Sequence, residues 1–276
     1  MKQIKNVIKK IVKSTISLLN ATASGRFAIQ QVLNNAMSRT SKINYDGIEL
    51  SFCVPNPTNK VRVDTFSTKE PETLEWIDSF TPGAVLWDIG ANVGLYSCYA
   101  AKRRNTRVYS FEPSVFNLEI LARNIWLNDL VKEITIIPLP LTEELKISTH
   151  NMTNTRWGGA MSTFSESYTH DGSALEKVFE FSTLGISMSL AVSLLKIQQP
   201  DYIKIDVDGI EHLVLKGGAN VLSNVKGILI EINEVFEKLA NDSATYLHEA
   251  GLVLKEKRHA EMFKDTICFN QIWVRE

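Results

Sequence analysis

The first 45 residues of the 276-residue sequence contain no acidic residue, although they contain eight lysines and arginines. The whole chain has a formal net charge of −1, so residues 46–276 together carry −9. A body this acidic is unsuited to a phosphate backbone, which argues against nucleic acid as a partner. Because residues 1–45 lack acids, the excess positive charge of the chain lies at its N-terminal end.

Cysteines and long apolar runs are also scarce. The three cysteines, Cys53, Cys98 and Cys268, are widely spaced and lack the spacing of zinc ligands, so we expect reduced core residues and no metal site built from them. No apolar run reaches the roughly 18 residues of a membrane span. Lysines interrupt the apolar stretch near the N-terminus, which argues against a signal peptide. We expect a cytoplasmic protein.

Residues 4–19 place isoleucine, valine and leucine at helical spacing, with lysines mostly on the opposite side. We therefore divide the chain into a basic helical extension, residues 1–45, and one domain, residues 46–276. The favoured interpretation is that the first helix packs on its own domain. The alternative is that residues 1–20 contact the inner face of the membrane through anionic lipid, or dock on a partner chain.

The remainder of the sequence alternates between short apolar segments and helical patterns, which predicts an α/β fold with a mostly parallel sheet. Residues 142–182 are polar and rich in serine and threonine. We expect them to form an irregular insertion over the ligand edge of the sheet, where an acceptor would be recognised. Two β segments, 252–257 and 267–274, predict an antiparallel hairpin at the C-terminus.

The segment from Val85 to Ser97 carries the strongest functional signal: an apolar strand ends in Asp88, and a glycine-bearing turn leads into a helix. Gly90 leaves the turn without a side chain, and Gly94 lets the helix approach the strand closely. A nicotinamide site needs a third glycine to admit a pyrophosphate, but Leu95 follows Gly94 here. Asp88 suits the positively charged amino-acid end of S-adenosylmethionine, so we expect that cofactor.

A second acid stands about 20 residues further on, which is the spacing expected for an acid that binds a ribose diol. The strand Arg107–Phe111 ends in Glu112 and Pro113. The glycine loop and Glu112 together make a much more specific signal than the loop alone.

A third strand, ending at Ile205, delivers Asp206, Asp208, Glu211 and His212 within seven residues. Ligands bind at this end of strands in open α/β sheets. Asp206, Asp208 and His212 are the candidate bases, and the sequence does not rank them. Glu211 either faces the site or stabilises the start of the next helix. Asp206 with Glu231 and Asn233 could also bind magnesium or calcium, but substrate binding explains the same acids.

Four motifs occur in order and resemble those of the FkbM-type S-adenosylmethionine-dependent methyltransferases. They are Asp88-x-Gly90-Ala91-Asn92-x-Gly94, Phe111-Glu112-Pro113, Leu121-x-x-Asn124-x-x-Leu127-Asn128 and Lys204-Ile205-Asp206-Val207-Asp208-Gly209-x-Glu211-x-x-Val214-Leu215-x-Gly217. The resemblance covers roughly residues 60–235.

This resemblance implies a Rossmann-like class I methyltransferase fold with a seven-stranded sheet and a reversed terminal hairpin. It also implies methylation of a hydroxyl oxygen on a glycan, glycolipid or secondary metabolite. By the match, the cofactor would contact Asp88, Gly90, Ala91, Asn92, Gly94, Glu112, Pro113 and Asp206.

Two other functions stay open from the sequence. One is a nicotinamide-dependent oxidoreductase, against which the missing glycine argues. The other is a non-catalytic module of the same fold that scaffolds a biosynthetic complex through the basic helix. The acids retained at both cofactor strands argue against that module.

Overall fold

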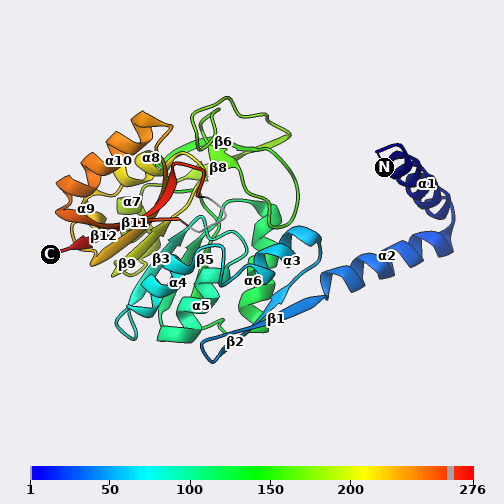
Figure 1. Ribbon diagram of the computed structural model, residues 1–276, viewed down its shortest axis with the longest axis horizontal. Coiled ribbons are helices and arrows are strands. Elements are labelled where there is room, and N and C mark those ends of the chain that lie inside the picture. Colours follow the sequence, from blue (N-terminus) through cyan, green and yellow to red (C-terminus); the bar gives the residue numbers. More distant parts are fainter. Residues whose placement is uncertain (1, 260–263) are drawn as a thin grey trace.

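The computed structural model describes residues 2–259 and 264–276, and its centre is one twisted sheet covered by helices on both faces (Figure 1). Six strands run in the same direction, and the last strand of the chain is inserted antiparallel between two of them. In sheet order the strands are β11 (Leu252–Arg258), β12 (Cys268–Arg275), β10 (Gly227–Asn233), β9 (Tyr202–Ile205), β3 (Val85–Ile89), β4 (Arg107–Phe111) and β5 (Ile134–Ile137). The predicted seven-stranded, mostly parallel sheet with a C-terminal antiparallel hairpin is confirmed.

The direction of the strand order reverses between β3 and β9. From β3 the chain moves outward through β4 and β5, and it then returns to place β9 on the other side of β3. Asp88 is paired with Lys204 across this junction. Open α/β sheets bind ligands at such a reversal, beyond the carboxyl ends of the strands. The topology therefore sets the site beside Gly90 and Asp206, which follow β3 and β9.

The period-two alternation of the strands buries both faces of the sheet. In β3, Leu86 packs with α4, α5 and α6, while Trp87 and Ile89 pack on the other side with α7, α8 and α10. The helices of this domain are α3 (Pro57–Asp64), α4 (Pro71–Asp78), α5 (Leu95–Arg104), α6 (Val115–Leu127), α7 (Met188–Leu195), α8 (Glu211–Lys216), α9 (Ala219–Leu222) and α10 (Glu237–Glu249).

Residues 142–182 are irregular only in part, which corrects the prediction. They contribute most of a three-stranded antiparallel sheet in which β6 (Lys146–Met152) lies between β7 (Ser162–Phe164) and β8 (Phe179–Gly185). Phe164 and Met152 are buried on one side of it. The alternation was hidden in the sequence because serine, threonine and histidine occupy many of its positions.

The first helix does not pack on the domain, which corrects the favoured interpretation. Helix α1 (Lys2–Asn20) and helix α2 (Ala23–Met37) form an arm that projects from one end of the molecule (Figure 1). The arm continues into a hairpin of β1 (Thr40–Tyr45) and β2 (Ile48–Cys53). The predicted boundary after residue 45 falls in the turn of this hairpin. Within the described residues, every helix is too short or too polar to cross a bilayer.

Candidate active site

The loop after β3 needs glycine at two positions. Gly90 has φ +85°, and a Cβ placed there would lie 1.8 Å from the carbonyl oxygen of Asp206. Gly94 has φ +78°, and its Cβ would lie 2.3 Å from Cδ1 of Leu121 on α6. L-residues adopt this backbone region only with strain. The two glycines therefore bring the loop against the end of β9 and against α6.

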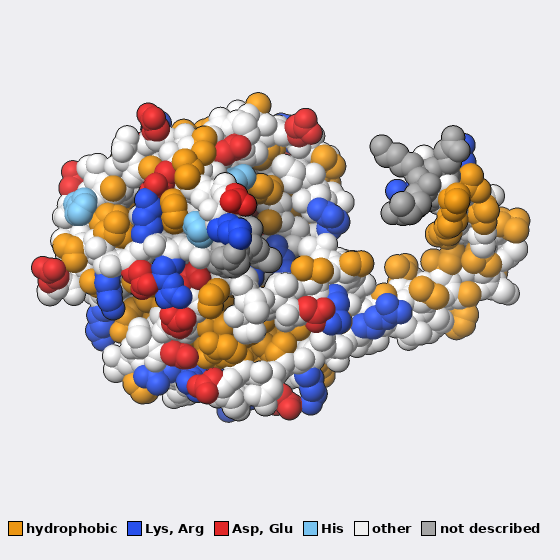
Figure 2. Space-filling model, in the orientation of Figure 1, with side chains coloured by type: hydrophobic (Ala, Val, Ile, Leu, Met, Phe, Trp, Pro, Cys, Tyr) orange, Lys and Arg blue, Asp and Glu red, His pale blue; other side chains and the backbone are white. Residues whose placement is uncertain are grey.

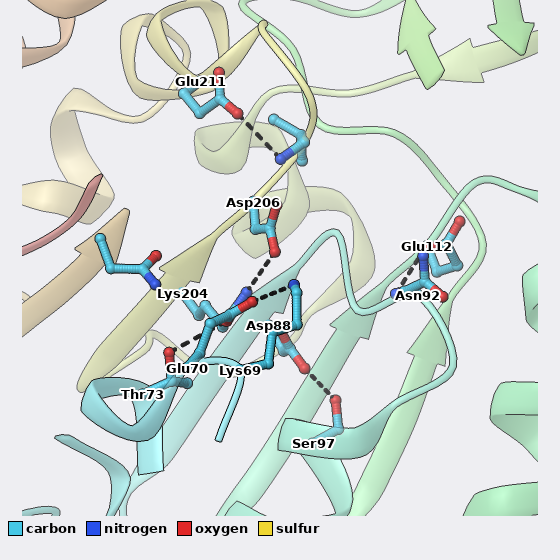
Figure 3. A network of polar contacts seen from close by, with 12 residues as sticks. Lys69, Glu70, Thr73, Asp88, Asn92, Ser97, Glu112, Lys204, Asp206 and Glu211 are labelled. Carbon is cyan, nitrogen blue, oxygen red and sulfur yellow. Dashed lines mark hydrogen bonds and ion pairs between the residues drawn. The ribbon is translucent and has the colours of Figure 1, made fainter. Parts of the chain in front are cut away.

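Asp88 is a fixed acceptor at the tip of β3. Its carboxylate accepts a hydrogen bond from the hydroxyl of Ser97 and is 2% exposed (Figure 3). Burial raises the pKa of Asp88, while the ammonium of Lys204 and the Ser97 hydroxyl act in the opposite direction. Asp88 lies on the wall of a cavity, so a ligand there meets a carboxylate whose position is set by the protein.

Lys204 is the buried cation of this site, and the sequence analysis gave it no role. Its Nζ lies 3.0 Å from Oδ2 of Asp206 and 5.3 Å from the centroid of the Tyr96 ring (Figure 3). Burial would lower the pKa of Lys204, but Asp206, Glu70 and Asp88 outweigh burial and raise it. A lysine in an otherwise apolar strand was the available signal, because a buried lysine needs anionic partners.

The segment before α4 adds a second ion pair that sequence reasoning also missed. Glu70 is 3% exposed, and it pairs with the ammonium of Lys69 and accepts a hydrogen bond from Thr73 (Figure 3). Pro71 is the first residue of α4 and directly follows this ion pair. The fold brings it over the tips of β3 and β9.

These groups line a cavity of about 480 Å³, called cavity B here. Its wall contains three cationic and three anionic side chains, together with the glycine loop and two aromatic rings. The charged ones are Arg62, Lys69, Lys204, Glu70, Asp88 and Asp206. A wall with both signs of charge in equal number suits a zwitterion, because each end of the ligand finds an opposite charge.

Glu112 follows β4 and is held by main-chain donors. Its two oxygens accept hydrogen bonds from the N–H groups of Asn92 and Ser114, each at 2.8 Å (Figure 3). Burial raises the pKa of Glu112 to about 8, and both N–H groups oppose the rise. The side chains of Asn92 and Asn117 donate to the carbonyl of Gly159. The glycine loop is thus tied to the segment between β6 and β7.

Glu112 and Pro113 line a second cavity of about 510 Å³, called cavity A here. Phe111, Leu139 and Leu141 supply an apolar wall. Gly90, Asn92 and Asp206 line both cavity A and cavity B, so the two cavities lie on either side of one loop. Cavity A combines this apolar wall with the carboxyl groups of Glu112, Asp206 and Asp208. Cavity B has charged side chains of both signs.

Asp208 joins cavity A to a third space. Oδ2 of Asp208 accepts the N–H groups of Met161 at 2.7 Å and Ser162 at 3.2 Å. Burial and the neighbouring Asp206 raise the pKa of Asp208 to about 6, although these two hydrogen bonds lower it. A carboxyl group with a pKa near the working pH is suited to proton transfer.

The third space, cavity C, has a volume of about 940 Å³ and extends from Asp208 toward β10 and β12. It meets cavity B at Lys69 and Glu70. Oε2 of Glu72 is buried at its wall and has no hydrogen-bond partner among the described residues, while Oε1 accepts from Asn270 at 2.7 Å. Its described lining is Lys69, Glu70, Glu72, Met161, His170, Asp208, Glu231, Asn233, His259, Thr266, Cys268 and Asn270.

The structure separates the remaining candidates. His212 lies outside cavities A, B and C; it is 2% exposed and packs edge-on against Phe236, so its position argues against the predicted role as a base. Glu211 accepts the N–H groups of Val207 and Gly209 and so stabilises the turn into α8. Glu231 and Asn233 line cavity C, and the nearby carboxylate of Asp206 adds to burial in raising the pKa of Glu231. Within residues 2–259 and 264–276, no group of three His, Cys, Asp or Glu side chains is arranged to hold a metal ion.

Comparison with known proteins gives matches of two kinds, in sequence and in fold. A family model described as methyltransferase FkbM domain matches residues 88–254. The hexuronic acid methyltransferase AglP of Haloferax volcanii is 30% identical over 155 residues, which are 54% of this chain and 56% of that protein. The chain thus spans little more than half the length of this curated relative.

Two solved structures resemble the model. A methyltransferase FkbM from Methylobacillus flagellatus KT has a TM-score of 0.49 and 16% identity, and the match covers 71% of this chain and 44% of that one. A putative tRNA (m1A22) methyltransferase from Streptococcus pneumoniae, in complex with S-adenosyl-L-methionine, has a TM-score of 0.45 and 15% identity; here 74% and 72% are covered.

The family match includes the residues that line the glycine-loop side of the cavities. It begins at Asp88 and contains Glu112, Asp206 and Asp208. It also covers more than half of the chain. The chain therefore belongs to the FkbM methyltransferase family.

Proposed function

We propose that the protein is an S-adenosylmethionine-dependent O-methyltransferase and that the cofactor occupies cavities A and B. The observation that carries this proposal is the chemical contrast between two cavities that share one glycine loop. Cavity A offers an apolar wall and Glu112, which suit an adenine ring and a ribose diol. Cavity B offers paired charges of both signs, which suit an ammonium and a carboxylate on one ligand.

The loop argues against a nicotinamide cofactor. Leu95 occupies the position of the third glycine, and Asp88 and Glu70 line the space beside the loop. Both carboxylates would repel a pyrophosphate at this position. The same carboxylates attract the positive end of S-adenosylmethionine.

Cavity C is the proposed acceptor site, because it meets both cofactor cavities. It shares Asp208 with cavity A, and it shares Lys69 and Glu70 with cavity B. The acceptor class we propose is a hydroxyl group on a sugar, glycan or small hydroxylated metabolite. The relative named as a hexuronic acid methyltransferase supports a sugar.

Asp208 is the proposed general base for this reaction. S-adenosylmethionine supplies an activated methyl group when bound. The protein then has to hold an acceptor hydroxyl in line with that group, which is worth about 7–11 kcal/mol for well-oriented reactants. Asp208 faces both cavities and takes the hydroxyl proton. The ion pair of Asp206 with Lys204 keeps Asp206 ionised, and its role is to position the cofactor rather than to move a proton.

Calorimetric titration of the full chain with S-adenosylmethionine, S-adenosylhomocysteine and NAD⁺ tests the cofactor. We expect the first two to bind and NAD⁺ not to bind; tight NAD⁺ binding would overturn the proposal. Methyl transfer is then tested with labelled cofactor against hydroxylated sugars and pathway intermediates. Cofactor binding with no transfer to any of these acceptors would favour the non-catalytic scaffold instead.

A further inference from the structure

Helix α1 exposes an apolar face that no part of the described domain covers. Eight large apolar side chains between residues 4 and 19 are exposed, from Leu19 at 41% to Leu18 at 74%. In Figure 2, hydrophobic side chains gather along the arm that carries α1 and α2. The eight are Ile4, Val7, Ile8, Ile11, Val12, Ile16, Leu18 and Leu19. Soluble monomeric proteins rarely expose a contiguous apolar patch of this kind unless it binds a partner.

The charge of the arm has a single sign. At 100° per residue, the apolar positions fall on one half of α1 and Lys9, Lys10 and Lys13 fall on the other half. No acid occurs before Asp46, so the eight basic residues of residues 1–45 have no acidic neighbour within that stretch. An apolar stripe beside unopposed cations is the pattern of a helix that lies in an anionic lipid interface.

The arm is firmly attached to the domain at its base. Asn124 on α6 accepts the N–H of Cys53 at 2.7 Å and donates to the carbonyl of Val93 at 2.8 Å. Asn128 pairs in both directions with the backbone of Ser51. The hairpin that carries the arm is therefore fastened to the helix beside the glycine loop. If the arm docks on a surface, this attachment would hold the domain in a fixed orientation beside that surface.

We propose that the arm formed by α1 and α2 docks the enzyme on a membrane surface that contains anionic lipid. The apolar side chains enter the boundary of the acyl chains, and the lysines pair with lipid headgroups. A second copy of the arm is a poor alternative partner, because α1 and α2 carry six basic residues and no acid, so two arms side by side would bring twelve basic residues together. The lipid surface supplies the opposite charge that a second arm lacks.

Vesicle sedimentation of the full chain tests the proposal. The probes are vesicles of phosphatidylcholine alone and vesicles of phosphatidylcholine mixed with phosphatidylglycerol. We expect binding only to the mixed vesicles and release as salt is added, because screening shortens the reach of surface charge. Ile11→Glu, and separately Lys9→Glu with Lys10→Glu and Lys13→Glu, should each lower the bound fraction by at least about tenfold.

Matched controls come from the domain surface. Val131 is 66% exposed and Lys132 is exposed beside it, so Val131→Glu and Lys132→Glu make the same kinds of change away from the arm. We expect both controls to bind vesicles like the wild type, and all variants to keep their affinity for S-adenosylmethionine. Equal binding by the arm variants would overturn the proposal. So would the absence of binding to either vesicle together with an oligomer that Ile11→Glu dissociates.

Discussion

Cavity B and cavity C meet at Lys69 and Glu70, but the chain builds them in different ways. Cavity B takes most of its wall from the short stretch Asp88–Tyr96 and the tip of β9. Cavity C draws single residues from α4, β10, β12 and the segment between β7 and β8. A wall made of consecutive residues leaves a motif in the sequence, whereas a wall made of scattered residues leaves none.

Their charges differ as well. Cavity B balances its three carboxylates with Arg62, Lys69 and Lys204. The described part of cavity C has four carboxyl groups, and Lys69 is its only lysine or arginine. Burial and Asp206 raise the pKa of Glu231 far above its ordinary value. We therefore expect changes in cavity B to act on the charged cofactor and changes in cavity C to act on the acceptor.

The largest effect is expected for Gly90→Ala. The new Cβ would collide with the backbone of Asp206, and alanine is strained at φ +85°. Displacement of this loop should weaken S-adenosylmethionine binding by about 100-fold or more, as measured by calorimetry. Gly83→Ala is the matched control, because Gly83 has φ +78° with nothing within 4 Å of its Cβ. A similar loss in the control would show that strain alone is responsible.

Asp208→Asn tests the junction of cavities A and C. We expect a loss of about 10²–10⁴-fold in kcat with little change in cofactor affinity. The pKa of Asp208 is raised to about 6, so the basic carboxylate form is lost as pH falls through that value. The wild-type kcat/KM should therefore fall below about pH 6, and the variant should lack this limb. Asp129→Asn, an exposed acid with φ +59°, is the control.

Asp88→Ala and Glu112→Ala probe the two cofactor cavities separately. Each removes a fixed carboxyl group and should weaken S-adenosylmethionine binding by about 1.5–3 kcal/mol, the usual worth of a hydrogen bond to a charged group. Calorimetric titration measures the change, with Asp129→Ala as the surface control. Unchanged affinity in both variants would contradict the proposal that the cofactor binds in cavities A and B.

Glu72→Gln tests cavity C, the proposed acceptor site. Oε2 of Glu72 has no partner at the wall of cavity C within residues 2–259 and 264–276, so we expect it to accept a hydrogen bond from the acceptor. The variant should raise the acceptor KM by about tenfold, the effect of roughly one hydrogen bond, without changing cofactor affinity. Glu75→Gln on the same helix pairs with Arg258 outside cavity C and serves as control. If cofactor affinity falls instead, the two cavities do not act separately.

The smallest effect is expected for His212→Gln. Burial lowers the pKa of His212 to about 4, and its ring packs against Phe236 outside the three cavities. The substitution should leave kcat and its pH dependence unchanged and lower only the melting temperature. A large fall in kcat at unchanged stability would restore His212 as a candidate base.

The same contrast explains what the sequence could predict. Val85–Ile89 and Tyr202–Ile205 are buried on both faces, so their apolar runs and terminal acids were visible. Asp208 was found, but its partners Met161 and Ser162 are more than 40 residues away and carry no signal. His212 shares a segment with Asp208, yet the turn at Gly209 directs it into the core. Proximity in sequence therefore did not translate into proximity in space.

Helix α6 has a consequence for any attempt to isolate the catalytic part of the chain. Asn124 and Asn128 bind the backbone of β2, which precedes the family match at residues 88–254. A fragment cut at those limits would remove the β2 partners of both buried amides, at about 1–3 kcal/mol for each group left unsatisfied. It would also lose β12, which bridges β10 and β11 in the sheet. We therefore expect the minimal stable unit to begin before β1. The segment that matches the family then depends for its stability on flanking segments that lie outside the match.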